Sequence, residues 1–198
     1  FISNSDLKIA FNEINKLILD FKPNQKYYDL SEFIDDFSPL ILNAPFLYKL
    51  NNLLHSDNLS LESLELHIQY PGSEAIPPHQ DNFYHNIDDN LGLKILIPFE
   101  KLSFNNGGLI FIDVKQGFPV LKHSPSSVES FSSYISSEMF DFDNCPKTTY
   151  FYEEGDISYH FLNTPHFSQG NQTSHGSAFI VFRMHSPLSV KNTYFEKI

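Results

Sequence analysis

The stretch Pro77-Pro78-His79-Gln80-Asp81-Asn82-Phe83-Tyr84-His85 decides how the rest of this sequence is interpreted. We predict a short strand from His79 to Phe83, in which side chains two apart point to the same face. His79 and Asp81 would then offer an imidazole nitrogen and a carboxylate oxygen to one metal ion. A histidine from a distant strand would complete the two-histidine, one-carboxylate triad typical of non-haem Fe(II) oxygenases. Such a triplet also occurs by chance, so the rest of the chain has to supply the context.

Length and composition narrow the class of protein. The chain has 198 residues, enough for one domain with a substantial core. A formal net charge of −11 argues against nucleic acid or an anionic membrane surface as a partner, and no apolar run approaches transmembrane length. The single cysteine, Cys145, excludes an internal disulfide. We therefore expect a cytoplasmic protein that acts on a small molecule, and the oligomeric state stays open.

Helical periodicity dominates the first third of the chain. Helices are predicted over residues 6–21, capped by Asp6, over residues 30–37, and over residues 45–54, with Pro45 in the first turn. Their apolar stripes are expected to cover one face of a sheet. The stripes consist of Leu7, Ala10, Phe11, Ile14, Leu17, Ile18 and Phe21, then Phe33 and Ile34, then Leu47, Leu50 and Leu54.

From Leu61 onward the apolar period changes from 3.6 to 2, which is the period of strands. Apolar and polar residues alternate from Leu64 to Gln69, which predicts a strand buried on one face only. Strands at a spacing of about ten residues, separated by turn signals, favour an all-β barrel or double-sheet sandwich with helices packed outside. The further strands are expected at residues 91–99, 109–114, 148–152, 157–161, 163–171 and 177–184, with a strong turn at 105–108.

Residues 115–145 show little periodicity and many serines. We predict a long loop with one short helix near residues 127–135. Long loops in compact domains are often functional, so this segment is a candidate lid.

The second metal-binding histidine has several candidates. His166 has the best context, because it lies on a late strand end behind Gly155-Asp156 and far from His79 in the sequence. His160 is its chief competitor. The weaker candidates are His85, His123 and His175. For any one of them, a hydrogen-bonded structural or surface histidine is the competing interpretation.

Taken in their order along the chain, these pieces resemble the phytanoyl-CoA dioxygenase-like family of Fe(II)/2-oxoglutarate oxygenases. His79-Gln80-Asp81 matches the family's H-Q-D, and Tyr70-Pro71-Gly72 looks like the turn before it. Asn105-Asn106-Gly107-Gly108-Leu109 is similar to the N-G-x-L entry of the next strand. Gly155-Asp156, followed by His166-Phe167-Ser168 and Asn171, resembles G-D…H-x-S-x-x-N. The resemblance covers about residues 40–184.

The resemblance implies iron ligands, a co-substrate and a fold. The implied Fe(II) ligands and catalytic residues are His79, Asp81 and His166, and Ser168 would contact the distal carboxylate of 2-oxoglutarate, with O2 as the oxidant. The implied fold is mainly β with flanking helices: a double-stranded β-helix, or jelly roll, with the N-terminal helices on one face. We expect a single domain over 1–198, with a helical cover (1–58), a β core (59–186) that carries the lid (about 115–145), and a C-terminal tail (187–198).

The sequence departs from the family pattern at the carboxylate anchor. The family places an arginine eleven residues after the distal histidine, where this chain has Ser177. Arg183, the only arginine beside 12 lysines, is one replacement if the register shifts. Lys94 is the other: it resembles the lysine of Jumonji-C-type oxygenases, and within an apolar strand it needs an anionic partner, such as 2-oxoglutarate, or a route to solvent. The family's P-G-S-H segment is also replaced, here by residues 113–117.

The sequence therefore supports three candidate functions. The first is an Fe(II)/2-oxoglutarate-dependent dioxygenase that hydroxylates or otherwise oxidises a small metabolite. The second is a non-catalytic protein of the same fold that binds a metal or a carboxylate. The third is a cupin-like metalloenzyme independent of 2-oxoglutarate, with His160 or His85 as an extra ligand. Candidates for the wall of the pocket are Gln69, Tyr84, Phe111 and Tyr159, and Gln69 is also a candidate contact of the co-substrate.

Overall fold

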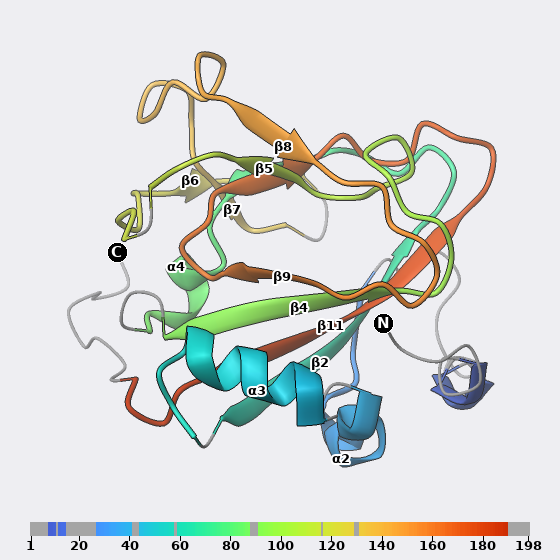
Figure 1. Ribbon diagram of the computed structural model, residues 1–198. Helices are drawn as coiled ribbons and strands as arrows, with labels where there is room; N and C mark the ends of the chain where they lie inside the picture. Colours follow the sequence, from blue (N-terminus) through green and yellow to red (C-terminus); the bar gives the residue numbers. More distant parts are fainter. Residues whose placement is uncertain are drawn as a thin grey trace.

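Two antiparallel sheets form the centre of the protein (Figure 1). The computed structural model describes residues 8–10, 12–14, 27–40, 44–57, 59–87, 91–115, 117–128 and 131–189. The larger sheet has the strand order β1-β2-β11-β4-β9 and the smaller one the order β3-β10-β5-β8. The mainly-β prediction is thus confirmed, and strands distant in the sequence, such as β2 and β11, lie side by side.

The strands of each sheet have the following bounds. The larger sheet contains β1 (Tyr27–Asp29), β2 (Ser60–Gln69), β4 (Gly92–Pro98), β9 (Ser158–Phe161) and β11 (Ser177–His185). The smaller sheet contains β3 (Ile76–His79), β5 (Ile110–Ile112), β8 (Lys147–Thr149) and β10 (His166–Ser168).

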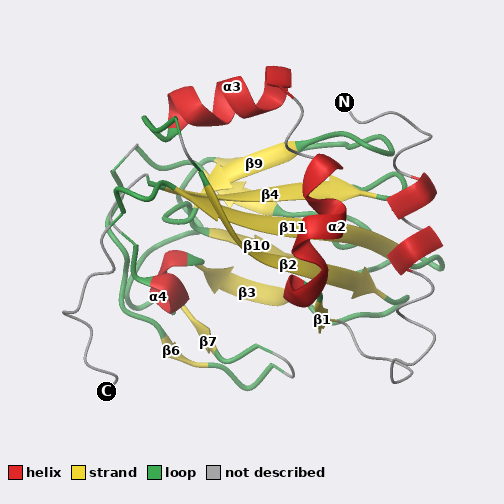
Figure 2. Cartoon of the chain, turned by 90° about the horizontal axis from the view of Figure 1, so that it is seen from below, coloured by secondary structure: helices red, strands yellow, loops and turns green. Residues whose placement is uncertain are grey.

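Helices cover the outer face of the larger sheet, as predicted (Figures 1 and 2). They are η1 (Ser31–Phe33), α2 (Ile34–Phe37), η2 (Ser38–Leu40) and α3 (Ala44–Leu53). Leu50 and Leu54 pack in one core with Leu64 and Phe182 of the sheet. Of the helix predicted over 6–21, residues 8–10 and 12–14 are helical, and its other residues lie outside the described part of the chain.

Strand β2 is covered on both faces, which corrects the prediction of a half-buried strand. Leu64 and Leu66 face the helices, as the alternation requires. However, Glu65 and Gln69 on the opposite face are also buried, because they line a cavity between the two sheets. The polar half of an alternating pattern therefore faces the interior of the protein in this strand.

The described residues of the predicted lid form no helix. Within the range 127–135, where a helix was expected, lies the short strand β7 (Ser133–Tyr134), which pairs with β6 (Ser124–Pro125). β7 lies beside β3 and α4 (Asn82–His85) (Figure 2). The NH of Ile135 donates to the carbonyl of Pro78 at 2.7 Å, so backbone pairing with the strand before His79 overrides local helix preference.

The turn at residues 105–108 has a steric reason for its glycines. Gly107 has a φ of 102°, a backbone conformation that residues with a side chain rarely adopt. A Cβ at this position would lie 2.4 Å from Cγ of Gln69. The predicted turn signal is therefore confirmed, and it allows the turn to approach the end of β2 closely.

Within the described part of the chain, no helix is both long enough and apolar enough to cross a membrane.

The core between the helices and the larger sheet can be tested with a matched pair of substitutions. Phe182 is fully buried in this core, whereas Phe151 is 77% exposed. We expect Phe182→Ala to lower the free energy of unfolding by about 3 to 5 kcal/mol, because it removes buried apolar surface and leaves a cavity. Phe151→Ala should change it by less than about 1 kcal/mol. Urea unfolding of both variants measures the difference, and equal losses would contradict this core.

Candidate metal centre and cavity

His79, Asp81 and His166 converge at the inner end of the cavity. One ligand atom from each of the three residues lies within 4.8 Å of the other two, and all three side chains are buried. Asp81 Oδ1 is 4.0 Å from Nε2 of His79, and Oδ2 is 3.7 Å from Nε2 of His166. His79 and His166 are direct partners on the adjacent strands β3 and β10. The structure therefore brings together the predicted triad.

Both histidines are oriented for metal binding by their backbone surroundings. Nδ1 of His79 lies 3.0 Å from the carbonyl of Pro77, and Nδ1 of His166 lies 2.9 Å from the carbonyl of Thr164. A carbonyl only accepts, so each Nδ1 carries the proton and each Nε2 presents a lone pair to the centre. Burial lowers the pKa of His79 to about 4 and holds the pKa of His166 well below its usual value. Both rings are thus neutral, as ligands must be.

The route by which Asp81 reaches the centre differs from the prediction. Strand β3 ends at His79, and Asp81 has right-handed helical dihedrals (φ −58°, ψ −35°) just before α4. The carboxylate and the imidazole meet because the chain turns after the strand, and not because of the period-two alternation of a strand.

Gln80, between His79 and Asp81, holds this turn in place, and the sequence analysis assigned it no role of its own. Its side chain is completely buried. Its amide donates to the carbonyls of Pro119 and Asn163 at 2.9 and 2.7 Å, and its carbonyl accepts from the NH of Leu121 at 2.8 Å. Its backbone NH donates to Nε2 of His123 at 3.1 Å. His123 therefore supports the metal motif from behind, which is a structural role.

The carboxylate of Asp81 has two further partners, Lys94 and His160. Nζ of Lys94 lies 3.0 Å from Oδ1, and Nε2 of His160 lies 3.1 Å from Oδ2. Burial by itself would raise the pKa of Asp81, but the ammonium of Lys94 and the hydrogen bond from His160 outweigh it and hold this pKa well below its usual value. The carboxylate is therefore ionised, as a metal ligand requires.

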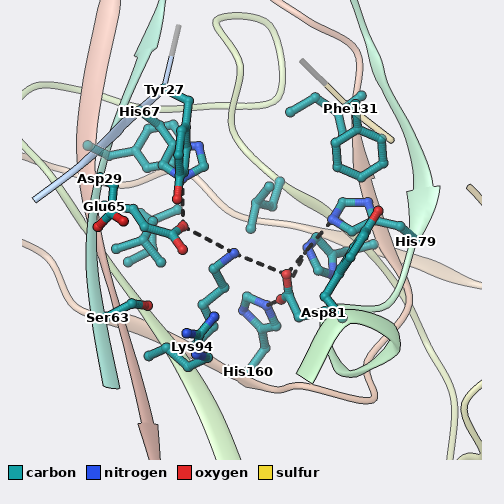
Figure 3. A pocket seen from close by; sticks show the side chains of 18 of the residues that line it. Tyr27, Asp29, Ser63, Glu65, His67, His79, Asp81, Lys94, Phe131 and His160 are labelled. Atoms are coloured by element: carbon teal, nitrogen blue, oxygen red, sulfur yellow. Dashed lines mark hydrogen bonds and ion pairs between the residues drawn. The ribbon is translucent and has the colours of Figure 1, made fainter. Parts of the chain in front are cut away.

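Lys94 also bridges Asp81 to a second buried carboxylate, Glu65, which lies 3.6 Å from its Nζ (Figure 3). Nε2 of His67 lies 3.1 Å from Glu65, and the hydroxyl of Tyr27 bonds to the same carboxylate. Burial opposes the charge of Lys94, but Asp81 and Glu65 raise its pKa above the usual value. The protein itself thus supplies the anionic partner for which the sequence analysis invoked 2-oxoglutarate.

Arg183 lines the same cavity and pairs with Glu62. Its Nε lies 3.1 Å from Oε2 of Glu62, and its Nη1 donates to Nε2 of His85 at 2.6 Å. The register of β2 against β11 shifts here, since Ser63 faces Arg183 and Leu61 faces the next residue of β11. This bulge turns Glu62 toward Arg183 on the cavity side. Burial, followed by Arg183, lowers the pKa of His85 to about 4, so its ring is neutral.

The cavity has a volume of about 640 Å³ and lies between the two sheets. The inner face of the larger sheet forms a charged and polar wall, which Figure 3 shows on the side of Glu65. Phe131 of the lid packs on the ring of His79 with a centroid distance of 4.5 Å. The apolar part of the lining consists of Ile76, Leu96, Leu109, Val128, Phe131, Phe179 and Val181.

The remaining predicted residues lie in different surroundings. Gln69 and Tyr84 line the cavity, whereas Tyr159 faces away from it with 43% of its surface exposed, which corrects that prediction. Phe111 lies beside the centre, 5.2 Å from His160 between ring centroids. Ser168 is fully buried, and its hydroxyl accepts from the NH of Gly170 at 3.3 Å, so its contact with a co-substrate stays a prediction. His175 is exposed and pairs with Ser174.

Comparison with known proteins shows the fold of this chain. No protein-family model matches the sequence, and no curated protein matches it. Among solved structures, the epimerase SnoN, in complex with Fe3+, alpha ketoglutarate and nogalamycin RO, aligns with a TM-score of 0.75 and 14% identity over 96% of this chain and 78% of that one. EvdO2 from Micromonospora carbonacea var. aurantiaca, complexed with 2-oxoglutarate, gives 0.72 and 15% over 98% and 86%. The non-heme alpha ketoglutarate dependent carbocyclase SnoK gives 0.75 and 12% over 96% and 79%.

The buried pair of Lys94 and Glu65 predicts a pH-dependent stability. Burial by itself would raise the pKa of Glu65, but Lys94 and the hydrogen bond from His67 lower it to about 2. Because the pKa of a free glutamate is 4.5, the stabilising contribution of Glu65 is complete above pH 4.5 and is lost as the pH falls toward 2. We expect Glu65→Gln to lower the free energy of unfolding by about 1 to 3 kcal/mol at pH 7.

Between pH 4.5 and 2, the free energy of unfolding of Glu65→Gln should fall less steeply than that of the wild type, because the variant lacks this ionisation. Urea unfolding at a series of pH values measures both effects. Glu153→Gln, which changes an exposed pair with Lys101, is the control and should follow the wild type. Identical acid profiles for Glu65→Gln and the wild type would contradict the assignment.

Proposed function

We propose that this chain is an Fe(II)- and 2-oxoglutarate-dependent oxygenase that acts on a small molecule. The observation that carries the proposal is the convergence of His79, Asp81 and His166 at the end of a cavity, with both Nε2 lone pairs and the carboxylate directed at one point. Three protein ligands of this kind on one side of an ion leave positions free for a co-substrate and O2. The fold shared with enzymes described as Fe3+ and alpha ketoglutarate complexes agrees with it.

The architecture proposed for the chain is a double-stranded β-helix of the phytanoyl-CoA dioxygenase-like type. The strand orders support it, because β2, β3, β4 and β5 alternate between the two sheets one by one, and so do β8, β9, β10 and β11. The metal ligands come from β3, the turn after it, and β10, as the resemblance implies. We propose one domain for the whole chain, a lid around β6 and β7, and a cytoplasmic location.

The residues of the chain have distinct tasks in this proposal. His79, Asp81 and His166 would hold Fe(II), and their buried position excludes bulk water from the centre. When bound, iron and 2-oxoglutarate would supply the oxidising chemistry, in which 2-oxoglutarate is decarboxylated to succinate, O2 is reduced and a C–H bond of the substrate is oxidised. The cavity wall and the lid would orient that C–H bond, and hydroxylation is the outcome proposed.

For the distal carboxylate of 2-oxoglutarate we propose Arg183. Gln69 and Ser168 belong to a separate, alternative anchor, because Gln69 faces Ser177, six residues from Arg183 along β11. Of the described residues that line the cavity, Lys94 and Arg183 are the lysine and arginine. The ammonium of Lys94 is already shared between two carboxylates, Asp81 and Glu65. A guanidinium has five N–H donors, and the contacts to Glu62 and His85 engage Nε and Nη1. Arg183 therefore keeps donors for a bidentate contact, and Lys94 is the alternative anchor.

A 2-oxoglutarate-independent metalloprotein is the second candidate function, and one observation favours it. Ser177 occupies the position where the resembling family has its arginine, and its hydroxyl donates to the carbonyl of Asn106. Both cavity cations are paired with carboxylates of the protein, so an incoming dicarboxylate has to compete with Glu62 or Glu65. A cupin-like metal site without 2-oxoglutarate would need no such exchange.

Anaerobic addition of Fe(II) and 2-oxoglutarate separates these functions. We expect a weak visible metal-to-ligand charge-transfer band in the wild type, because 2-oxoglutarate would chelate the iron. Asp81→Ala should lose the band together with the bound iron. Fe(II) binding without a band would reject the oxygenase and favour the second candidate, whereas a band with no succinate release in any substrate screen would leave the co-substrate site intact and the substrate open.

The anchor can be assigned with a pair of charge-removing variants. We expect Arg183→Met to weaken 2-oxoglutarate binding at least 10-fold, measured by titration of the charge-transfer band, because a charge-assisted contact worth about 1.5 to 3 kcal/mol is lost. Fe(II) affinity should stay within about 3-fold of the wild type, since Arg183 contacts none of the three ligands. Unchanged 2-oxoglutarate affinity would move the assignment to Lys94.

A further inference from the structure

We propose that Lys94 and His160 are a pair of positioning residues that hold one oxygen each of the metal-ligand carboxylate, Asp81. The inference rests on the metal centre of the proposed function, and it adds two residues that do not bind the metal themselves. It concerns the metal site alone, so it can be tested without 2-oxoglutarate or a substrate.

The geometry of the carboxylate is nearly symmetrical. Oδ1 lies 3.0 Å from Nζ of Lys94 on one side and 4.0 Å from Nε2 of His79 on the other. Oδ2 lies 3.1 Å from Nε2 of His160 and 3.7 Å from Nε2 of His166. Each oxygen thus has one donor behind it and one metal-ligand histidine in front of it. Whichever oxygen binds the ion, the other keeps a donor, which favours monodentate coordination.

The two donors come from one place in the larger sheet. Lys94 on β4 and His160 on β9 are direct partners across adjacent strands. Their side chains therefore leave the sheet on the same face, toward the turn that carries Asp81 (Figure 3). The ligand histidines belong to the smaller sheet. The carboxylate is consequently held between the two sheets, and its direction is set by both.

Hydrogen-bond chemistry makes His160 a donor and not a fourth ligand. An ionised carboxylate only accepts, so Nε2 of His160 carries the proton directed at Oδ2. A protonated nitrogen has no lone pair for a metal ion. Nδ1 of His160 is buried and has no hydrogen-bond partner among the described residues, so the contact to Asp81 is what orients this ring. His160 is only 7% exposed, and its ring lies 4.6 Å from the ring of His166.

Lys94 has the matching role on the other oxygen. It balances the charge of two buried carboxylates, Asp81 and Glu65, which would otherwise repel each other across the cavity. With the pair in place, Asp81 keeps its direction before the metal arrives. An ordered carboxylate binds an ion more tightly than a mobile one, and outer partners of metal ligands are commonly worth 10- to 100-fold in affinity.

Metal affinity measured with Fe(II) alone under anaerobic conditions tests the pair. We expect His160→Leu and Lys94→Met each to weaken Fe(II) binding about 10- to 100-fold by calorimetric titration. His160→Gln should restore most of the affinity, because its side-chain amide can donate near the position of Nε2. The matched controls are His175→Leu and Lys101→Met, both at exposed residues, and they should bind Fe(II) as the wild type does.

A second measurement uses the wild type alone and tests whether His160 is a hydrogen-bond donor to Asp81 or a metal ligand. Pulsed EPR of the Cu(II)-loaded wild type counts the imidazoles that bind the metal, and we expect two. Three bound imidazoles would overturn the assignment of His160 and support the cupin-like site. If His160→Leu and Lys94→Met both bind Fe(II) with the affinity of the wild type, the proposed positioning role of the two residues is wrong.

Two checks keep these outcomes separate from other failures. Circular dichroism and thermal melting of the metal-free variants show whether each one folds, and if His160→Leu does not, His160→Gln and the EPR count still decide. A wild type that binds Fe(II) tightly but gives no charge-transfer band with 2-oxoglutarate would reject the oxygenase and leave the positioning pair standing. A wild type that binds no metal would reject both.

Discussion

The buried carboxylate of Asp81 is the constraint on which the site depends. A charge removed from water is costly unless cations and hydrogen bonds surround it. The protein meets this requirement with the ammonium of Lys94 and the N–H of His160, both from the larger sheet, whereas Asp81 itself follows β3 of the smaller one. Contacts of Asp81 therefore connect the two sheets at the point where a metal would bind. The strand pairing within each sheet sets the position of that point.

The loops around the centre are fixed by a second, uncharged network. Gln80 joins the metal motif to the segments around Pro119 and Asn163, and His123 holds its backbone NH. The proposed lid is attached to the same motif, since Tyr84 of α4 bonds to Ser133 of β7 and Phe131 packs on His79. A movement of the proposed lid would therefore displace the side chain of His79, because Phe131 packs on it.

The charge of the cavity wall bears on the dicarboxylate site that we propose. Its wall contains acidic side chains that already pair with the cations, as in Lys94 with Glu65 and Arg183 with Glu62. A bound divalent ion would change this balance by two charges. In the oxygenase that we propose, metal binding would thus have to precede or accompany co-substrate binding, since the ion supplies the positive charge that the wall lacks.

The sequence by itself determined most strand and helix segments, with the exception of residues 79–83 and 127–135, and the turn at Gly107, because these leave local signals of period and glycine. It also indicated His79, Asp81 and His166, through residue type and the resemblance of their motifs. It could not determine why Asp81 reaches the centre, since a turn replaces the predicted strand. Nor could it assign the roles of Gln80, Glu65 and His160, which arise from contacts with Asn163, Lys94 and Asp81, respectively, on distant segments of the chain. Only the tertiary structure decided that the polar face of β2 lines a cavity, because an alternating pattern shows which residues share a face and not what that face contacts.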